Sequence, residues 1–315
     1  MCYKYSKNGI NHKTIDVVWP YYKDEKFLDT SIEHLNKQTL QPHRLIFVDD
    51  CNNKKNLKGY IRKRLNKNIQ LTFVENKINY SVTKSVSIGV NKVKSKYLYI
   101  QSTDDIIHNN FLELNIKYLE KNKKAAYSFS NIFINNLNNK KSYFINFDFI
   151  KSNYVSPYEV SKLYKKFQFK IYHNTVVFNS KKFLNSNIFK DEYGRRADML
   201  NLQYLSMKHG FCYLNKTISK FTIRADQVSS TKLNNEYLIN ELTYLKNKNR
   251  KFFYFIIKHN LHYEISFFSL LNIKNNFRHI ITFKYLSRSI KFKLWKYFRF
   301  YLNPKILNFL FNVFS

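Results

Sequence analysis

The chain has 315 residues, and 54 Lys and Arg against 21 Asp and Glu give it a formal net charge of +33. Hydrophobic residues make up 44% of it, which excludes a disordered chain. Cys2, Cys51 and Cys212 lie far apart, which excludes a disulfide framework and a Cys-x-x-Cys zinc site and favours a reducing cytoplasm.

Apolar periodicity predicts alternating strands and helices in the first part of the chain. Short apolar runs predict strands at 15–19 (stopped by Pro20), 44–48, 69–74 and 97–100. Helical spacing predicts helices between them at 27–37, 57–65 and 81–93. Because such helices join parallel strands through right-handed crossovers, we expect an α/β fold with a mainly parallel sheet flanked by helices.

The pattern is less regular beyond residue 126. We expect a strand at 173–178 and a helix at 198–209 that ends at Gly210. From about residue 246, Lys and Arg alternate with aromatic residues, and Glu264 is the only acid before residue 305. We therefore predict a main domain over 1–240 and a basic, aromatic-rich helical extension over 241–315.

Neither a secretory signal nor a membrane-spanning helix is expected. The first 13 residues are polar, and no uninterrupted apolar run of about 18 residues exists.

Two pairs of adjacent carboxylates follow predicted strands. Asp49-Asp50 comes after strand 44–48, and Asp104-Asp105 comes after strand 97–100. Ligands bind at the carboxyl ends of parallel strands. Because adjacent negative charges repel each other, we expect a divalent metal or hydrogen-bond donors there. A Mg²⁺ or Mn²⁺ ion on Asp104-Asp105 would carry a substrate phosphate. The alternative is that each pair only caps the next helix.

The glycine patterns of dinucleotide-binding and P-loop sites are absent, which disfavours both kinds of site. Five segments resemble, in order and spacing, those of the family 2 inverting glycosyltransferases with the GT-A fold. They are the opening strand and turn (17–25), a first helix ending near Asn-Gln-Thr (31–39), Val48-Asp49-Asp50, the stretch from Asn76 to Gly89, and the metal strand (97–105). The resemblance covers about residues 15–230.

This resemblance implies a donor site for a nucleotide sugar, and we expect a UDP-linked one. Tyr22 and the turn from Pro20 to Glu25 would border the nucleobase, and Asp50 would bind uracil or ribose. Asp104 would contact the ribose or sugar. Asp105 would coordinate a Mn²⁺ or Mg²⁺ ion on the diphosphate, which Arg224 would also reach.

The resemblance also implies an acceptor site lined by His173, Asn174 and Thr175. It makes Asp198 the candidate general base, because an acceptor hydroxyl must lose its proton as it attacks the anomeric carbon. The alternative for Asp198 is a first-turn acid that stabilises its helix.

The chain departs from the family pattern at four places. The Gly of the family's Asn-x-Gly segment is replaced, by Asn79 or Ser81. Ser102 stands where many members have the first acid of Asp-x-Asp-Asp, and the Arg expected near Val86 is absent, with Lys84 nearby. Arg224 occupies the His position of the family's Tyr-Arg-x-His-x-x-x-x-Ser segment. An ordinary surface arginine is the alternative for Arg224.

For the extension we considered a membrane-interface element, a simple helical cap and a single-strand nucleic-acid binder. We expect an inverting hexosyltransferase of bacterial surface-polysaccharide assembly (O-antigen, capsule or lipooligosaccharide). It would act on a lipid-linked saccharide, peripherally on the anionic cytoplasmic face of the inner membrane, without a nucleic-acid partner. The alternatives are a basic nucleic-acid-binding protein and an inactive scaffold with the same fold.

Overall fold

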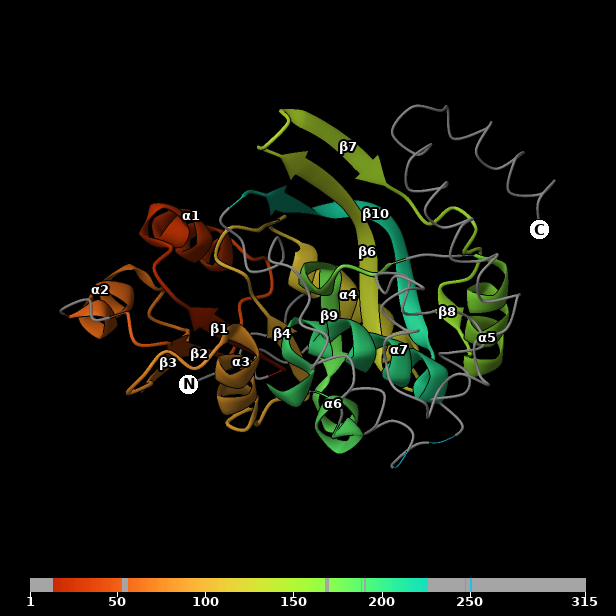
Figure 1. Cartoon of the computed structure of the whole chain (residues 1–315), viewed down its shortest axis with the longest axis horizontal. Coiled ribbons are helices and arrows are strands. Elements are labelled where there is room, and N and C mark those ends of the chain that lie inside the picture. The colour runs from red at the N-terminus through yellow and green to blue at the C-terminus, as the bar shows by residue number, and fades with distance from the viewer. Residues whose placement is uncertain are drawn as a thin grey trace, which may run out of the picture. The chain divides into compact units, whose positions relative to one another are not determined.

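The computed structural model describes residues 14–52, 56–167, 170–187, 189 and 191–225, together with residues 247 and 250 (Figure 1). Residues 14–160 and 171–225 of this set belong to one compact unit, whereas 161–170 belong to a second. Apart from residues 247 and 250, the predicted extension over 241–315 lies outside the described residues, as does the boundary near 240. Within the described part, no helix is long and apolar enough to cross a bilayer.

Four parallel strands build the first half of the sheet, in the spatial order β3-β2-β1-β4. They are β1 (Ile15–Tyr21), β2 (Arg44–Asp49), β3 (Gln70–Glu75) and β4 (Tyr97–Ile100). All four predicted strands are confirmed. The expectation that Pro20 ends the first strand is wrong. Strand β1 continues to Tyr21, whose carbonyl accepts a hydrogen bond from Asp50 N at 2.9 Å.

The second half of the sheet mixes strand directions. Strand β9 (Val176–Asn179) is antiparallel to β4 and to β6 (Tyr127–Asn136), and β10 (Phe211–Ile223) is parallel to β6. Three short strands complete the sheet: β5 (Ile106–Ile107) and β8 (Tyr154–Val155) on β10, and β7 (Lys141–Ile145) on β6. The predicted mainly parallel α/β architecture is confirmed.

The predicted helices all form, with ends shifted by a few residues. They are α1 (Glu25–Asn36), α2 (Leu57–Arg64), α3 (Val82–Val90) and α7 (Ala197–His209). Gly210 follows α7 at φ +71°, a conformation that favours glycine, and its N–H bonds to Ser206 O. The structure adds α4 (Phe111–Lys121), α5 (Pro157–Lys166), α6 (Ser180–Ser186) and the 3₁₀ turns η1 (His173–Thr175) and η2 (Asp191–Arg196).

The predicted strand at 173–178 is wrong in its first half. Thr175 donates through its backbone N–H (3.0 Å) and its hydroxyl (2.7 Å) to the carbonyl of Tyr172. These bonds close the turn η1, so β9 begins only at Val176. A side-chain bond to nearby backbone competes with strand pairing in this way.

Alternate residues of β1 serve the two faces of the sheet, as the period of two requires. Ile15, Val17 and Trp19 pack in one apolar cluster with residues of α1, α2 and α4. On the other face, α3 approaches the sheet so closely that a Cβ on Gly89 would lie 2.6 Å from Val18 Cγ1. The core thus fixes β1 between two helix layers.

We expect Gly89→Ala to lower the free energy of unfolding by about 1–3 kcal/mol, since an added methyl group would overpack the contact between α3 and the sheet. Gly59→Ala is the matched control. Gly59 is exposed on α2, and the atoms nearest to its added methyl belong to the Asn56 side chain, which can move. Denaturant unfolding followed by circular dichroism measures both. Equal stabilities of the two variants would contradict the close packing of α3.

Candidate functional site

The carboxyl ends of β1, β2 and β3 are joined by backbone hydrogen bonds. Asp50 N donates to Tyr21 O (2.9 Å), and Asn76 N donates to Asp49 O (2.8 Å). Because these strands are parallel neighbours, the residues that follow them meet at one edge of the sheet. The two acid pairs predicted to share this edge follow β2 and β4, on either side of β1.

Asn52 ties the turn after β1 to the turn after β2. Its side-chain oxygen accepts a hydrogen bond from Lys23 N (3.0 Å), and its own N–H donates to Asp49 Oδ1 (3.0 Å). Lys23 and Cys51 have φ values of 51° and 64°, which non-glycine residues seldom adopt. Such a conformation persists only where surrounding bonds enforce it. Sequence reasoning did not single out Asn52.

Asp50 is oriented by its neighbours. Its Oδ1 accepts hydrogen bonds from Asn76 Nδ2 (2.8 Å) and Tyr80 N (3.0 Å), and Asn76 also donates to Ser85 Oγ (2.9 Å). No hydrogen bond within the described part of the chain engages Asp50 Oδ2. Both hydrogen bonds are accepted by Oδ1, which leaves Oδ2 for a ligand. The role of Asp50 in binding uracil or ribose stays a prediction.

The remaining residues predicted to border the nucleobase lie at the same edge. Tyr22 is 41% exposed, with Lys23 Nζ 5.0 Å from the centre of its ring. Pro20 is in β1, and Glu25 begins α1 and accepts a 3.4 Å hydrogen bond from Asn52 Nδ2. Tyr80, which sequence reasoning missed, is 46% exposed and adjoins Asp50 through its backbone. No short motif marks it.

Asp49 differs from Asp50 in its electrostatics. Burial raises the pKa of the Asp49 carboxyl, and the charges of Glu75 and Asp50 add to the rise, while the Asn52 N–H acts against it. The two members of this pair are therefore not equivalent.

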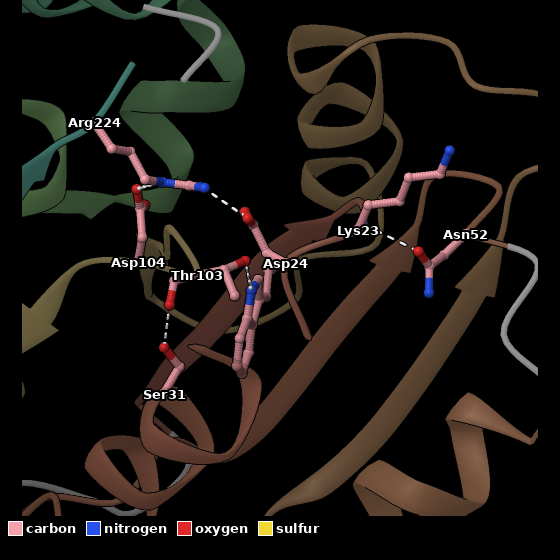
Figure 2. Close-up of polar contacts among 8 residues, drawn as sticks. Lys23, Asp24, Ser31, Asn52, Thr103, Asp104 and Arg224 are labelled. Atoms are coloured by element: carbon pink, nitrogen blue, oxygen red, sulfur yellow. Dashed lines mark hydrogen bonds and ion pairs between the residues drawn. The ribbon is translucent and has the colours of Figure 1, made fainter. Parts of the chain in front are cut away.

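Thr103 connects the loop after β4 to the core of the protein. Its hydroxyl accepts a hydrogen bond from Trp19 Nε1 (3.0 Å), and its carbonyl accepts one from the Ser31 hydroxyl (Figure 2). Both donors are buried, in β1 and α1 respectively. The position of Asp104 is thus fixed by the core beneath it.

Arg224 follows β10 and joins two carboxylates of the site. Its Nε donates to Asp104 Oδ2 at 2.9 Å and its Nη2 to Asp24 Oδ1 at 2.7 Å (Figure 2). The guanidinium carbon lies 5.0 Å from the centre of the Phe27 ring. Burial acts to lower the pKa of Arg224, but the bonds to Asp104 and Asp24 outweigh it, so its pKa is raised. Arg224 is not an ordinary surface arginine.

Asp105, unlike Asp104, is buried in the protein. It is 4% exposed, its Oδ1 accepts a 3.2 Å hydrogen bond from Thr222 N, and its buried Oδ2 has no partner of normal geometry among the described residues. Burial raises the pKa of Asp105 well above its ordinary value, and the charge of Asp104 adds to this. The Thr222 N–H and the nearby side chains of Ser102 and Asn174 act in the opposite direction.

These residues do not fit the divalent metal that the sequence led us to expect. A divalent ion takes accessible carboxylate oxygens as ligands, whereas Asp105 is buried and bonded to Thr222 N, and the Asp104 carboxylate is held by Arg224. Within the described residues, no group of three His, Cys, Asp or Glu could hold an ion. The assignment of a metal to Asp105 stays a prediction, and this placement argues against it.

The predicted acceptor residues form η1, between the loop after β4 and helix α7. Asn174 and Thr175 are buried at 4% and 1% exposure, and the Thr175 hydroxyl is bonded within its own turn. The Asn174 side chain has no hydrogen-bond partner of normal geometry among the described residues. The His173 ring packs on Phe178, with 5.2 Å between ring centres. Thr175 is buried and bonded within its own turn, and its assignment to the acceptor site stays a prediction.

Asp198, the candidate base, lies in the first turn of α7 and is half-buried. Its Oδ1 accepts a hydrogen bond from Met199 N at 2.6 Å. Burial lowers the pKa of His173, and the negative charge of Asp198 acts against this, so the structure brings Asp198 beside the predicted acceptor segment. Arg196, which sequence reasoning missed, is 2% exposed at the start of the same helix.

Solved structures share this fold. A Staphylococcus aureus TarS structure (residues 1–349) in complex with UDP-GlcNAc superimposes with a TM-score of 0.61 at 14% identity, over 88% of this chain and 79% of that one.

Curated relatives match part of the chain at higher identity and over a shorter length. An uncharacterised glycosyltransferase of Methanocaldococcus jannaschii is 32% identical over 117 residues, which are 37% of this chain and 40% of that protein. Glycosyltransferase GlyG of Streptococcus pneumoniae is 33% identical over 101 residues, 31% of this chain and 33% of that protein. The match thus spans two fifths or less of each relative.

A family model matches residues 16–185, which is more than half of the chain and includes β1 to β4 with both acid pairs. The chain belongs to glycosyl transferase family 2.

Proposed function

We propose that the protein transfers a hexose from a UDP-linked sugar to a hydroxyl of a lipid-linked saccharide, with inversion at the anomeric carbon. The observation that carries the donor part is the edge of the sheet where Asp50, Tyr22 and the Arg224–Asp104 pair gather. The TarS structures that share the fold contain UDP-GlcNAc or UDP, which supports a nucleotide-sugar donor.

In this proposal Tyr22, Pro20 and Glu25 surround the base, and the free oxygen of Asp50 accepts a hydrogen bond from uracil or ribose. The diphosphate lies toward Arg224, which can stabilise the charge that develops on the leaving group. No step runs through a divalent metal, because the residues do not fit one.

Asp198 is the proposed base. It accepts the proton of the acceptor hydroxyl while the acceptor oxygen forms its bond to the anomeric carbon. On the opposite face, the bond from that carbon to the diphosphate oxygen breaks, and the nucleoside diphosphate leaves with the electron pair. The half-buried position of Asp198 beside η1 supports this role.

The acceptor and the cellular location rest on charge. A net charge of +33 suits a negatively charged surface, and a lipid-linked acceptor requires the enzyme to work at a membrane. We propose a peripheral position on the cytoplasmic face of a bacterial inner membrane, in surface-polysaccharide assembly. The extension over 241–315 would supply much of the contact.

The donor proposal predicts that UDP-hexoses bind in preference to GDP- or ADP-linked sugars in a calorimetric panel. Asp50→Asn should weaken UDP binding about ten-fold or more, since a bond to a charged group is worth about 1.5–3 kcal/mol. Glu120→Gln on α4 is the control, because that acid pairs with Lys96, which precedes β4 at the end of the strand opposite the candidate site. A folded protein that binds no nucleotide sugar but binds single-stranded RNA in a salt-sensitive manner would refute the proposal and favour a nucleic-acid binder.

Asp198→Asn should leave UDP-sugar binding within about two-fold and lower the rate of transfer by about 10²–10⁴, because the amide cannot accept the proton. Glu113→Gln removes another first-turn acid, on α4, and should change stability but not transfer. A near-normal rate for Asp198→Asn would show that another group is the base, and no transfer by the wild type with any acceptor would support an inactive scaffold.

Flotation with vesicles tests the location. The full-length protein should float with vesicles that contain phosphatidylglycerol and not with pure phosphatidylcholine, and 0.5 M salt should weaken binding because screening shortens electrostatic range. Removal of residues 246–315 should reduce flotation. Vesicle binding that depends neither on lipid charge nor on salt concentration would contradict a peripheral electrostatic contact.

A further inference from the structure

The guanidinium of Arg224 lies against two carboxylates of the candidate donor site. It bonds to Asp104, the more accessible member of the second acid pair, and to Asp24 in the turn after β1 (Figure 2). The Arg224 side chain is 11% exposed and packs over Phe27, so its position is determined by packing as well as by charge.

A divalent cation and Arg224 would compete for the same carboxylate. Asp105 is turned toward Thr222 in β10 and is 4% exposed, so it offers no second accessible ligand. Ser102 stands where a further acid would lie. A metal on Asp104 would have to displace the guanidinium and then remain beside it, against the repulsion of like charges.

The two carboxylates that hold Arg224 are not equally shielded. The Asp104 side chain is 9% exposed, whereas the Asp24 side chain is 23% exposed. An incoming anion therefore replaces Asp24 more readily than Asp104. Arginine suits such an exchange, because it stays charged at every working pH and its planar fork can bind a carboxylate and a phosphate together.

We propose that Arg224, anchored by Asp104, takes the place of the divalent metal, and that the donor diphosphate displaces Asp24 from it. This inference rests on the proposed UDP-sugar donor and deepens it, since it makes donor binding independent of metal.

Calorimetry with UDP and the full-length protein tests the inference. The dissociation constant in EDTA should agree within about three-fold with that in Mn²⁺, and electron paramagnetic resonance should detect no Mn²⁺ bound by the protein alone. UDP binding that disappears in EDTA and returns with Mn²⁺ would overturn this inference and leave the donor proposal intact. A folded protein that binds UDP under neither condition would overturn both.

Substitutions of Arg224 and Asp24, with one control, sharpen the test. Arg224→Gln should weaken UDP binding in EDTA at least ten-fold, whereas Arg64→Gln, which removes a similar Arg–Asp bond (Arg64 Nε to Asp29 Oδ1, 2.9 Å) outside the site, should not. Arg224→His should lose affinity in EDTA and regain it with Mn²⁺, because Asp104 is then released.

Asp24→Asn should bind UDP as tightly as the wild type or more tightly, since it removes a competitor of the diphosphate. Undiminished UDP affinity of Arg224→Gln in EDTA, or weaker binding by Asp24→Asn, would contradict the proposal.

Discussion

The position of β1 between β2 and β4 is the constraint on which the candidate site depends. Its parallel register places Tyr21 beside Asp49, and Val18 beside Ile100. Strand ends that are far apart in the sequence are thereby brought to one edge. The core enforces this register, because a slip by one residue would turn the Trp19 face of β1 toward α3 and the Val18 face toward α1.

The loops at that edge are held by polar contacts rather than by apolar packing alone. Thr103 accepts hydrogen bonds from Trp19 and Ser31, and Asn52 connects the turns after β1 and β2. Left-handed residues such as Cys51 cost about 1–3 kcal/mol each and persist where the surroundings over-determine them. The edge is therefore preorganised before any ligand arrives.

Burial and ion pairing give the four acids of the two pairs different electrostatic environments. The acid pairs look alike in the sequence, yet Asp105 is buried with a raised pKa while Asp104 is ion-paired with Arg224. Asp50 accepts both of its hydrogen bonds through Oδ1, from Asn76 and Tyr80. Asp49 is buried, and burial raises its pKa. A strongly basic chain thus keeps a small acidic site whose members differ in chemistry.

The strands and helices up to residue 105, the helix that ends at Gly210, and the placing of both acid pairs at carboxyl ends of strands could be predicted from the sequence. Those features follow from local periodicity and from parallel topology. Three features became visible only in the folded chain: Asp105 is buried against Thr222, Arg224 pairs with Asp104 and Asp24, and residues 173–175 form a turn. Each of these depends on contacts made across the fold or on a side-chain bond that competes with the strand. The periodicity of apolar residues in the sequence predicts neither such contacts nor such a bond.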